Sequence, residues 1–365
     1  MTEPPAKSSG TDITEQELRH NTLNEVTGGI HLVTTADGTK LVRKRLRPPG
    51  HPDPSRPERW RASEDPRAYS WWRREADVYA DAELRDRIER AGLGIQPARI
   101  ELGDPDGLVL WLDWAEGRTA ADLTLDDYVA LATGLGRWQA RGPLDRPWTS
   151  RGFLRSYAGA NFAAAQADGA ADLVYDEATW RHPLIAENWP ADLQTRWQAL
   201  IAAKDRLFDL MEALPRTFCH LDVWAMNIVS RADGVTVLLD WAFAGDGAIG
   251  EDVGNAIPDA CFDLLWPAER VRELDAAMTA AYIEGLRQAG WQEDPRLARL
   301  GIVAACVKYI WLVPWMLYRV ADHEHRAYFR DADSIQLYRS RGMVFSLLTD
   351  WHDDALSLSS DLGLI

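Results

Sequence analysis

Residues 217–255 read TFCHLDVWAMNIVSRADGVTVLLDWAFAGDGAIGEDVGN. This stretch places four polar residues, His220, Asp222, Asn227 and Asp240, in or beside apolar runs. A charged group without a partner is costly to bury. We therefore expect these side chains to serve one site.

A β-hairpin explains how these residues meet. Residues 231–234, Arg-Ala-Asp-Gly, predict a turn between two short strands, 227–230 and 235–239. The hairpin folds Asp240 back beside the polar residues that precede the turn. A metal site needs this kind of geometry, in which ligands distant along the chain are brought together.

The spacing of the polar residues is typical of phosphoryl transfer. Magnesium prefers oxygen ligands and keeps waters and substrate phosphates in its shell. Asn227 and Asp240, on adjacent strands, can supply two such oxygens. Asp222 lies on the preceding loop, where it can accept the proton of an attacking hydroxyl. The whole pattern, His-x-Asp-x-x-x-x-Asn and then an apolar strand ending in Asp, is far more specific than a single His-x-Asp.

Length and composition bound the class of protein. The chain has 365 residues, enough for two lobes with a core. Its net charge of −16 argues against a nucleic-acid or anionic-membrane partner and is read first as a source of solubility. The three cysteines show no CxxC pairing, and no apolar signal segment stands at the N-terminus. We expect reduced cysteines and a cytoplasmic protein.

The first third of the chain predicts a small β-rich lobe over residues 21–114, preceded by a flexible tail over residues 1–20. Two β-rich runs surround Gly28 and Gly29, and a third strand covers residues 40–46. One helix over residues 70–91 and two further strands complete the lobe, at residues 95–102 and 107–112. The prediction is a five-stranded sheet plus one helix.

Residues 115–365 predict a large helical lobe that contains the hairpin. Thr124 and Asp127 have the spacing of a capping box, which opens a helix through about Gln139. The most apolar segment, residues 301–318, contains Lys308 and Pro314, so we expect a buried helix pair rather than a membrane span. The fold class is α+β with two lobes.

Residues 43–74 are basic within an acidic chain, with ten basic and four acidic residues. One interpretation is an electropositive rim for a polyphosphate or another anionic ligand. The other is a solvated loop that balances nearby acids. The sequence leaves both open.

The chain resembles the aminoglycoside phosphotransferase and choline kinase-like family, small-molecule kinases with a protein-kinase-like bilobal fold. The resemblance covers about residues 23–255 and is sharpest at residues 220–227, 239–241 and 250–255. It implies that Asp222 is the catalytic aspartate and that Asn227 and Asp240 hold Mg²⁺.

The resemblance also implies a nucleotide site for ATP, with GTP as the alternative nucleotide. Lys44 matches the strand lysine on the phosphates, with Arg43 as its rival on the opposite face of the strand. Glu75 matches the helix partner of that lysine. The loop over the nucleotide corresponds to Gly28 and Gly29, and the adenine hinge to Leu112, Asp113, Trp114 and Ala115.

Two further residues match supporting positions of the family. Asp252 matches an acid that braces the catalytic loop, and it also stands where a helix N-cap ahead of Val253 is expected. His220 is expected to orient the loop rather than to exchange protons.

The leading hypothesis is an ATP- and Mg²⁺-dependent kinase that phosphorylates a hydroxyl of a small molecule. We favour an antibiotic, such as an aminoglycoside or a macrolide, or a natural-product intermediate over a primary metabolite such as choline or a sugar. The alternative is a catalytically silent kinase-like binding protein. A protein acceptor is disfavoured, because no long activation segment precedes Asp252. Aromatic and acidic residues that could line an acceptor site are Trp224, Glu187, Asp246, Trp311, Trp315 and Tyr318.

Overall fold

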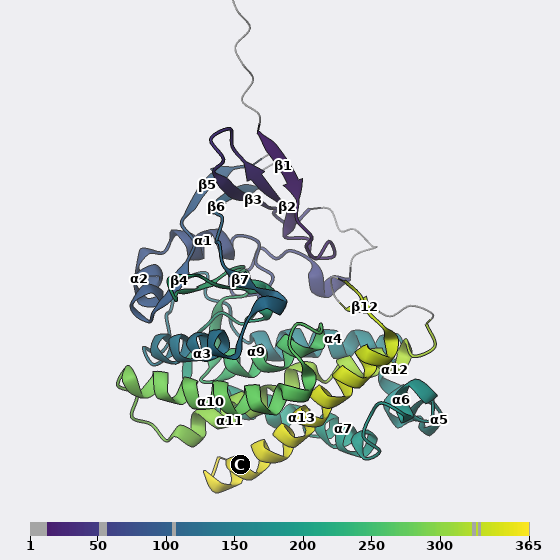
Figure 1. Ribbon diagram of the computed structural model, residues 1–365. Coiled ribbons are helices and arrows are strands. Elements are labelled where there is room, and N and C mark those ends of the chain that lie inside the picture. The colour runs from purple at the N-terminus through teal and green to yellow at the C-terminus, as the bar shows by residue number, and fades with distance from the viewer. Residues whose placement is uncertain (1–12, 51–56, 104–106, 323–325, 328–329, 365) are drawn as a thin grey trace, which may run out of the picture.

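The structure, a computed structural model, describes residues 13–50, 57–103, 107–322, 326–327 and 330–364. An N-terminal part built on a β-sheet is followed by a larger helical part, as Figure 1 shows. The predicted α+β class is confirmed.

The N-terminal sheet is antiparallel and has the strand order β1-β2-β3-β6-β5. In the central strand β3, Lys44 and Leu46 are buried, whereas Arg45 between them is exposed. This alternation follows from the two-residue period of a strand. Lys44 lies opposite Ile30 of β2 and Leu110 of β6. The strands are β1 (Thr14–Glu17), β2 (Thr27–Thr34), β3 (Lys40–Leu46), β5 (Ala98–Leu102) and β6 (Leu108–Asp113).

Two predictions for the start of the chain are wrong. The expected tail contains strand β1, because Thr14–Glu17 pairs with β2; residues 1–12 of that tail lie outside the described part. Gly28 and Gly29 do not separate two strands but lie inside β2, at a bulge opposite β3. Gly29 has a φ of +135°, which a residue with a side chain rarely adopts.

The single helix expected at residues 70–91 is two helices, α1 (Arg74–Ala80) and α2 (Ala82–Arg90). Asp81 separates them, since its backbone is extended and its carboxylate accepts a hydrogen bond from the N–H of Leu84. Asp81 is therefore the N-cap of α2, a position where aspartate is favoured.

The strand expected at residues 95–102 is likewise divided, into β4 (Leu93–Ile95) and β5. Strand β4 leaves the N-terminal sheet and pairs in parallel with β10 (Thr236–Leu238). It belongs to a second sheet of order β4-β10-β9-β7, whose other strands are β7 (Arg118–Thr119) and β9 (Ile228–Ser230).

The central hairpin is confirmed. Strands β9 and β10 pair antiparallel, with Ile228 opposite Leu238. Asn227 ends the short 3₁₀ helix η4 (Ala225–Asn227), directly before β9. Strands β8 (Arg216–Cys219) and β11 (Gly245–Ala248) form a separate antiparallel pair on either side of the hairpin in the sequence.

Helices make up most of the remaining chain. The capping box of Thr124 and Asp127 opens α3 (Leu125–Gln139) as predicted. The other helices are α4 (Phe153–Ala167), α5 (Glu177–Trp180), α6 (Pro183–Ala186), α7 (Leu193–Ala202), α8 (Lys204–Ala213), α9 (Glu251–Phe262), α10 (Val271–Gln288), α11 (Pro295–Ala304), α12 (Leu312–Tyr318) and α13 (Ser334–Asp361), with 3₁₀ turns η1 (Glu58–Trp60), η2 (Ala120–Asp122), η3 (Ala171–Tyr175), η5 (Ala268–Arg270) and η6 (Ala305–Tyr309). The short strands β12 (Arg326–Ala327) and β13 (Arg330–Asp331) precede α13.

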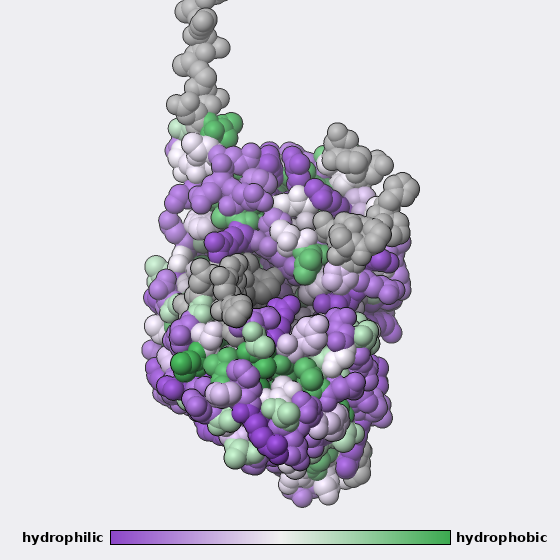
Figure 2. Space-filling model, turned by 90° about the vertical axis from the view of Figure 1, so that its right-hand side faces the viewer, coloured by the Kyte–Doolittle hydropathy of each residue, from purple (hydrophilic) through white to green (hydrophobic). Residues whose placement is uncertain are grey.

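The apolar segment near residue 310 lies inside the helical part. Among the described residues, one segment, Pro295–Tyr318, is long and apolar enough to cross a membrane, and 83% of its most apolar window is buried within the protein. It comprises α11, η6 and α12, as expected of a buried helix pair. Figure 2 shows the side of the molecule that carries α12, where hydrophilic surface surrounds a hydrophobic area.

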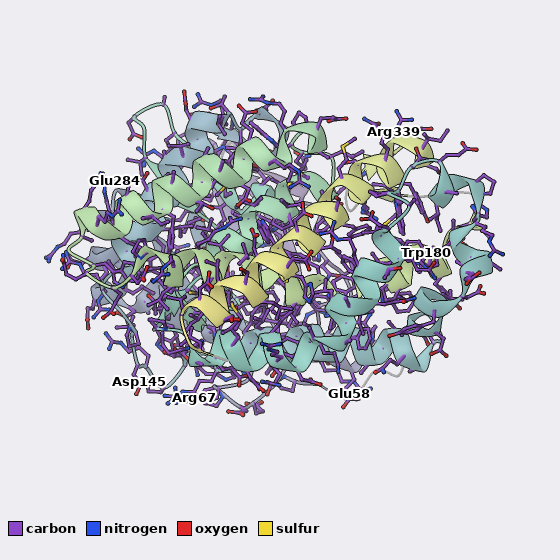
Figure 3. The ribbon with its side chains drawn as sticks, turned by 90° about the horizontal axis from the view of Figure 1, so that it is seen from below. Glu58, Arg67, Asp145, Trp180, Glu284 and Arg339 are labelled. Carbon is purple, nitrogen blue, oxygen red and sulfur yellow. The ribbon has the colours of Figure 1, made fainter. Side chains whose placement is uncertain are left out.

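Ion pairs join the N-terminal part to the helical part. The guanidinium of Arg67 lies 3.3 Å from the carboxylate of Asp145, and Figure 3 shows both at the same edge. Arg146 pairs with Asp81, at 2.7 Å, and with Glu83 of α2. These contacts fix the start of α2 relative to the loop before α4.

Candidate functional site

A buried lysine joins the sheet to the hairpin. The Nζ of Lys44 lies 2.7 Å from Oε2 of Glu75 in α1 and 2.9 Å from Oδ1 of Asp240, which follows β10. Lys44 and Glu75 are 4% and 2% exposed. Arg43 points to the other face of β3, where it pairs with Glu15 of β1. The structure therefore places Lys44, and not Arg43, in this cluster.

The charges of this cluster shift one another's pKa values. Burial acts to lower the pKa of Lys44, but the carboxylates of Asp240 and Glu75 outweigh it and raise the pKa above its ordinary value. Burial raises the pKa of Glu75 to about 7 against the opposing effect of Lys44. For Asp240, burial is outweighed by Lys44, and the pKa is lowered. When both carboxylates are ionised, the one ammonium between them leaves a net negative charge, which an added cation would neutralise.

Asp222 and Asn227 are in direct contact. The Nδ2 of Asn227 donates to the backbone oxygen and to Oδ2 of Asp222, both at 3.0 Å. The amide nitrogen is thereby used, so the amide oxygen is the atom that a cation would take. Burial raises the pKa of Asp222 to about 7, and the charge of Lys308 is the largest influence against that rise.

Asp252 holds the backbone of the loop before Asp222. Its carboxylate accepts hydrogen bonds from the N–H of His220 at 2.9 Å, the N–H of Leu221 at 2.7 Å and the side-chain amide of Gln139 at 2.6 Å. Leu221 has a positive φ of 68°, a strained conformation that such contacts must maintain. The expected N-cap role is wrong, because Gly250 caps α9 and Asp252 lies within the helix.

His220 ties the two loops of the site together. Its Nε2 lies 2.9 Å from the oxygen of Leu239, and its Nδ1 lies 3.3 Å from the N–H of Asp222. These contacts assign the proton to Nε2, which donates, and leave Nδ1 as the acceptor. Burial lowers the pKa of His220 to about 4, so the ring is neutral at pH 7. This geometry supports the role expected for His220, which is to orient the loop that carries Asp222.

Most residues expected at the nucleotide loop and hinge lie on the same sheet as Lys44, and Trp114 and Ala115 directly follow its strand β6. Gly29 lies opposite Arg45 on β3, one residue from Lys44. In the hinge, the N–H groups of Asp113 and Trp114 donate to Pro97 and Lys40, at 3.4 and 3.2 Å. The carbonyl of Asp113 accepts from the side chain of Gln96 at 2.6 Å. An adenine would therefore have to use other hinge groups, such as the N–H of Ala115.

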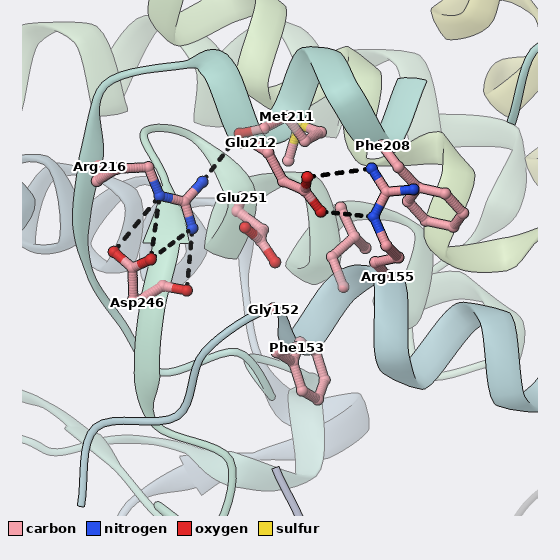
Figure 4. Close-up of a pocket in the computed structure, with 10 residues that line it drawn as sticks. Gly152, Phe153, Arg155, Phe208, Met211, Glu212, Arg216, Asp246 and Glu251 are labelled. Carbon is pink, nitrogen blue, oxygen red and sulfur yellow. Dashed lines mark hydrogen bonds and ion pairs between the residues drawn. The ribbon is translucent and has the colours of Figure 1, made fainter. Parts of the chain in front are cut away.

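The residues expected at an acceptor site do not form one cluster. Asp246 pairs with Arg216 at 3.1 Å in a small pocket beside Glu251, shown in Figure 4, whose lining includes neither Asp222 nor Lys44. Glu187 is exposed and is the C-cap of α6. An amine partner at Asp246 would have to compete with Arg216.

The aromatic candidates lie at the surface end of the apolar segment or on the loop after Asp222. Trp224 is half-buried immediately before η4. Trp311 and Trp315 are half-buried and pack against the core, and Tyr318 is 52% exposed with its ring 5.6 Å from that of Trp315. Their role in acceptor binding stays a prediction.

The basic segment 43–74 makes many contacts with the protein itself. Arg47 donates to the carbonyl of Gly28 at 3.3 Å, and Arg67 pairs with Asp145. Residues 51–56 lie outside the described part. For these arginines the structure favours the loop that balances nearby acids over a rim reserved for a ligand.

Arg74 is a structural residue that the sequence did not single out. It is fully buried, and burial lowers its pKa to about 9. Its guanidinium meets backbone carbonyls instead of carboxylates, which explains why no acid at a telling spacing revealed it. The five acceptors, at 2.6 to 3.1 Å, are the carbonyls of Pro66, Ala68, Tyr69, Trp148 and Ala242. Arg74, which directly precedes Glu75, thus connects the start of α1 to the segment after Asp240.

We expect Arg74→Met to lower the free energy of unfolding by about 3 kcal/mol or more, because the buried carbonyls lose their donor. Denaturant titration would measure this loss. The matched control is Arg73→Met, which removes an exposed neighbour that lies over the ring of Trp72 and should cost no more than about 0.5 kcal/mol. Equal losses in the two variants would contradict the role given to Arg74.

Comparison with known proteins identifies proteins that are similar to this chain. The phosphotransferase enzyme family matches residues 32–294. An amicoumacin kinase solved in complex with AMP-PNP, Ca²⁺ and Ami is 14% identical, with a TM-score of 0.52 over 91% of this chain and 88% of that chain. No curated protein matches the sequence significantly.

Two other solved structures have lower TM-scores. An ethanolamine kinase from Plasmodium vivax is 12% identical, with a TM-score of 0.49 over 94% of this chain and 84% of that one. An aminoglycoside phosphotransferase from Streptomyces rimosus is 17% identical, with a TM-score of 0.41 over 82% and 92%. The family match covers most of the chain, and the amicoumacin kinase shares its bilobal, kinase-like fold. The chain belongs to the phosphotransferase enzyme family and is a small-molecule phosphotransferase.

Proposed function

We propose that the protein transfers the γ-phosphoryl group of ATP to a hydroxyl of a small molecule, with Mg²⁺ as cofactor. The observation that carries this proposal is the contact of Lys44 with both Glu75 and Asp240. It brings a cation of the sheet to the end of the hairpin, where Asp222 and Asn227 also lie. Phosphoryl transfer needs these groups together, because it depends on positioning and charge neutralisation.

Each group has a role in this proposal. Asn227 and Asp240 would hold Mg²⁺, which neutralises phosphate oxygens when bound. Lys44 binds phosphate oxygens of the nucleotide, and Glu75 positions it. Asp222 orients the acceptor hydroxyl and takes its proton. Among the described residues no cluster of three or more His, Cys, Asp and Glu side chains could hold a metal, so substrate phosphates would complete the shell.

The acceptor we favour is an antibiotic or a natural-product intermediate. Support comes from the amicoumacin kinase, whose structure holds Ami together with a nucleotide analogue. Trp224 adjoins the loop of Asp222. Trp311, Trp315 and Tyr318 would line another side of the acceptor site. Cys219, Cys261 and Cys306 are free and buried, which favours a reducing compartment such as the cytoplasm.

Thermal unfolding with nucleotide tests the cofactors. We expect ATP with Mg²⁺ to stabilise the protein, by about 2.7 kcal/mol at a ligand concentration of 100 Kd. ATP with EDTA should stabilise it much less, because Asp240 then meets the phosphates without a cation. Stabilisation that is indifferent to Mg²⁺, without transfer, would favour a catalytically silent binding protein instead. Parallel titration with GTP establishes the nucleotide preference.

Transfer of label from γ-labelled ATP to a panel of hydroxyl compounds identifies the acceptor. The panel should contain aminoglycosides, macrolides, choline, ethanolamine and simple sugars. Labelling of choline or a sugar in preference to every antibiotic would overturn the favoured acceptor class while leaving the phosphotransferase assignment intact.

A further inference from the structure

The N-terminal sheet ends in a strand with an open edge. Within the described residues, β5 pairs with β6 on one side only, and β1 ends the sheet on the opposite side (Figure 1). Four of the five residues of β5 are exposed, and Leu102 is 91% exposed. An exposed edge of this kind is a ready-made template for pairing with another strand.

The hydrogen bonds at both ends of β5 show which backbone groups point away from β6. The N–H of Asp113 donates to Pro97 at 3.4 Å, and the N–H of Gly103 donates to Gly107 at 2.8 Å. Hydrogen-bonded and non-hydrogen-bonded pairs alternate along an antiparallel ladder, so the backbone groups of the odd-numbered residues of β5 face β6. The residues whose N–H and C=O groups point to the open edge are therefore Ala98, Ile100 and Leu102.

The side chains on either side of Ile100 carry opposite charges. Arg99 and Glu101 lie on one face of the strand, and their side chains are 68% and 47% exposed. Trp111 of β6 contacts both of them: its indole N–H donates to Glu101 at 2.9 Å, and its ring centre lies 5.7 Å from the guanidinium of Arg99. Both charges are therefore held at the edge before any partner binds.

We propose that β5 pairs antiparallel with β5 of a second copy of the chain, about a two-fold axis at Ile100. In this register the outward N–H and C=O of Ile100 bond to those of Ile100 in the second copy. Arg99 of each copy then lies opposite Glu101 of the other, in the type of pair whose side chains are closest. Leu102 of each copy lies beside Ala98 of the other, and the two five-stranded sheets become one continuous sheet. This pairing does not depend on the proposed function.

Charge complementarity selects a second β5 over the other edge of the sheet. The N–H of Leu18 donates to Ile30 at 2.8 Å, so the backbone groups of Glu15 and Glu17 in β1 face outward. Antiparallel pairing of β1 with a second β1, centred on or between these two residues, brings their carboxylates opposite one another, which is destabilising. Strand β5 is self-complementary, and two-fold pairing closes the assembly at a dimer.

The interface is small, because β5 has only five residues. One strand pair buries less than the roughly 1,200 Å² of a standard interface. Each chain has a net charge of −16, so two copies also repel each other at long range. We therefore expect a weak dimer that forms as the protein concentration rises, at an ionic strength of about 0.15 M, where the Debye length is about 8 Å.

Sedimentation velocity of the full chain over a series of rising concentrations measures the dimer. We expect Arg99→Glu to weaken it about tenfold or more, because both cross-strand ion pairs become pairs of like charge. Glu101→Arg should weaken it for the same reason. The double variant R99E/E101R exchanges the two charges and should restore the affinity to within about threefold of wild type.

Amide hydrogen exchange resolved to single residues tests the register. The N–H groups of Ile100 and Leu102 should gain protection as the concentration rises. Those of Arg99 and Glu101 face β6 and should not change, which makes them the internal control. Ile100→Pro removes an outward N–H and leaves the bonds to β6 in place, so it should abolish the dimer while the circular dichroism spectrum stays that of wild type.

A chain that stays monomeric at every concentration would overturn the proposal, as would a dimer that neither Arg99→Glu nor Ile100→Pro weakens. Assemblies that keep growing beyond the dimer would also overturn it, because they require head-to-tail pairing of β5 with β1. If Ile100→Pro does not fold, the charge-reversal series decides, since both side chains are exposed. None of these measurements needs a nucleotide, so a failure here leaves the proposed function untouched.

Discussion

Asp222→Ala should lower the rate of phosphoryl transfer by about 10³- to 10⁴-fold, because general-base catalysis by a positioned side chain contributes up to about 10⁴. The affinity for MgATP should change by no more than about threefold. Asp222 contacts Asn227 through its side chain and its backbone oxygen, and the backbone contact survives the substitution. The metal ligands therefore stay in place while the acceptor loses its base.

The measurement is single-turnover transfer of label from ATP, with nucleotide binding followed separately by thermal shift. Asp233→Ala is the matched control: it removes an acid from the turn of the same hairpin, where Asp233 is exposed and pairs with Arg231. This control should keep wild-type transfer. Transfer at the wild-type rate in Asp222→Ala would remove Asp222 from the mechanism, whatever the nucleotide affinity.

The hairpin was predictable because its signals are local. The Arg-Ala-Asp-Gly turn and the two apolar runs specify the pairing of β9 with β10, and the turn length then fixes where Asp240 lies. The choice between Lys44 and Arg43 was left open by sequence, since strand alternation separates the two faces without saying which is buried. The neighbouring elements decide it: α1 brings Glu75 to one face and β1 brings Glu15 to the other.

Contacts between segments that are distant in the chain could not be predicted from local sequence patterns. Arg74 bonds to backbone groups, which every residue carries, so no residue pattern marks its partners. Asp252 also bonds to backbone groups, and its bracing role was expected only from the family resemblance. Lys308 was visible as a charge within an apolar run, but its neighbours Asp259 and Tyr157 come from other helices. Only the break at Asp81 had a local signal, an aspartate suited to an N-cap inside a predicted helix.

Lys44→Met should abolish most transfer, with a loss of about 10²-fold or more in kcat/KM, because the nucleotide phosphates lose a fixed cation. The same change leaves Glu75 and Asp240 without their counter-ion. Removal of one partner of a buried ion pair costs about 3–5 kcal/mol when the other charge stays buried. Glu75 can reduce that cost by taking up a proton, since its pKa is about 7 even with Lys44 present.

This proton uptake gives the variant a pH signature. Glu75 titrates higher in the folded protein than an ordinary glutamate does. The folded state therefore binds the proton more tightly, and the free energy of unfolding falls as pH rises from the ordinary pKa to the folded pKa. Loss of Lys44 raises that pKa further, so the free energy of unfolding of Lys44→Met should decline more steeply than that of wild type as pH rises through 7. Arg43→Met, the adjacent change on the opposite face, removes only a partly exposed pair with Glu15 and should keep the activity and the wild-type pH slope. Matching activity losses and pH slopes in the two variants would show that Lys44 neither meets the phosphates nor controls Glu75.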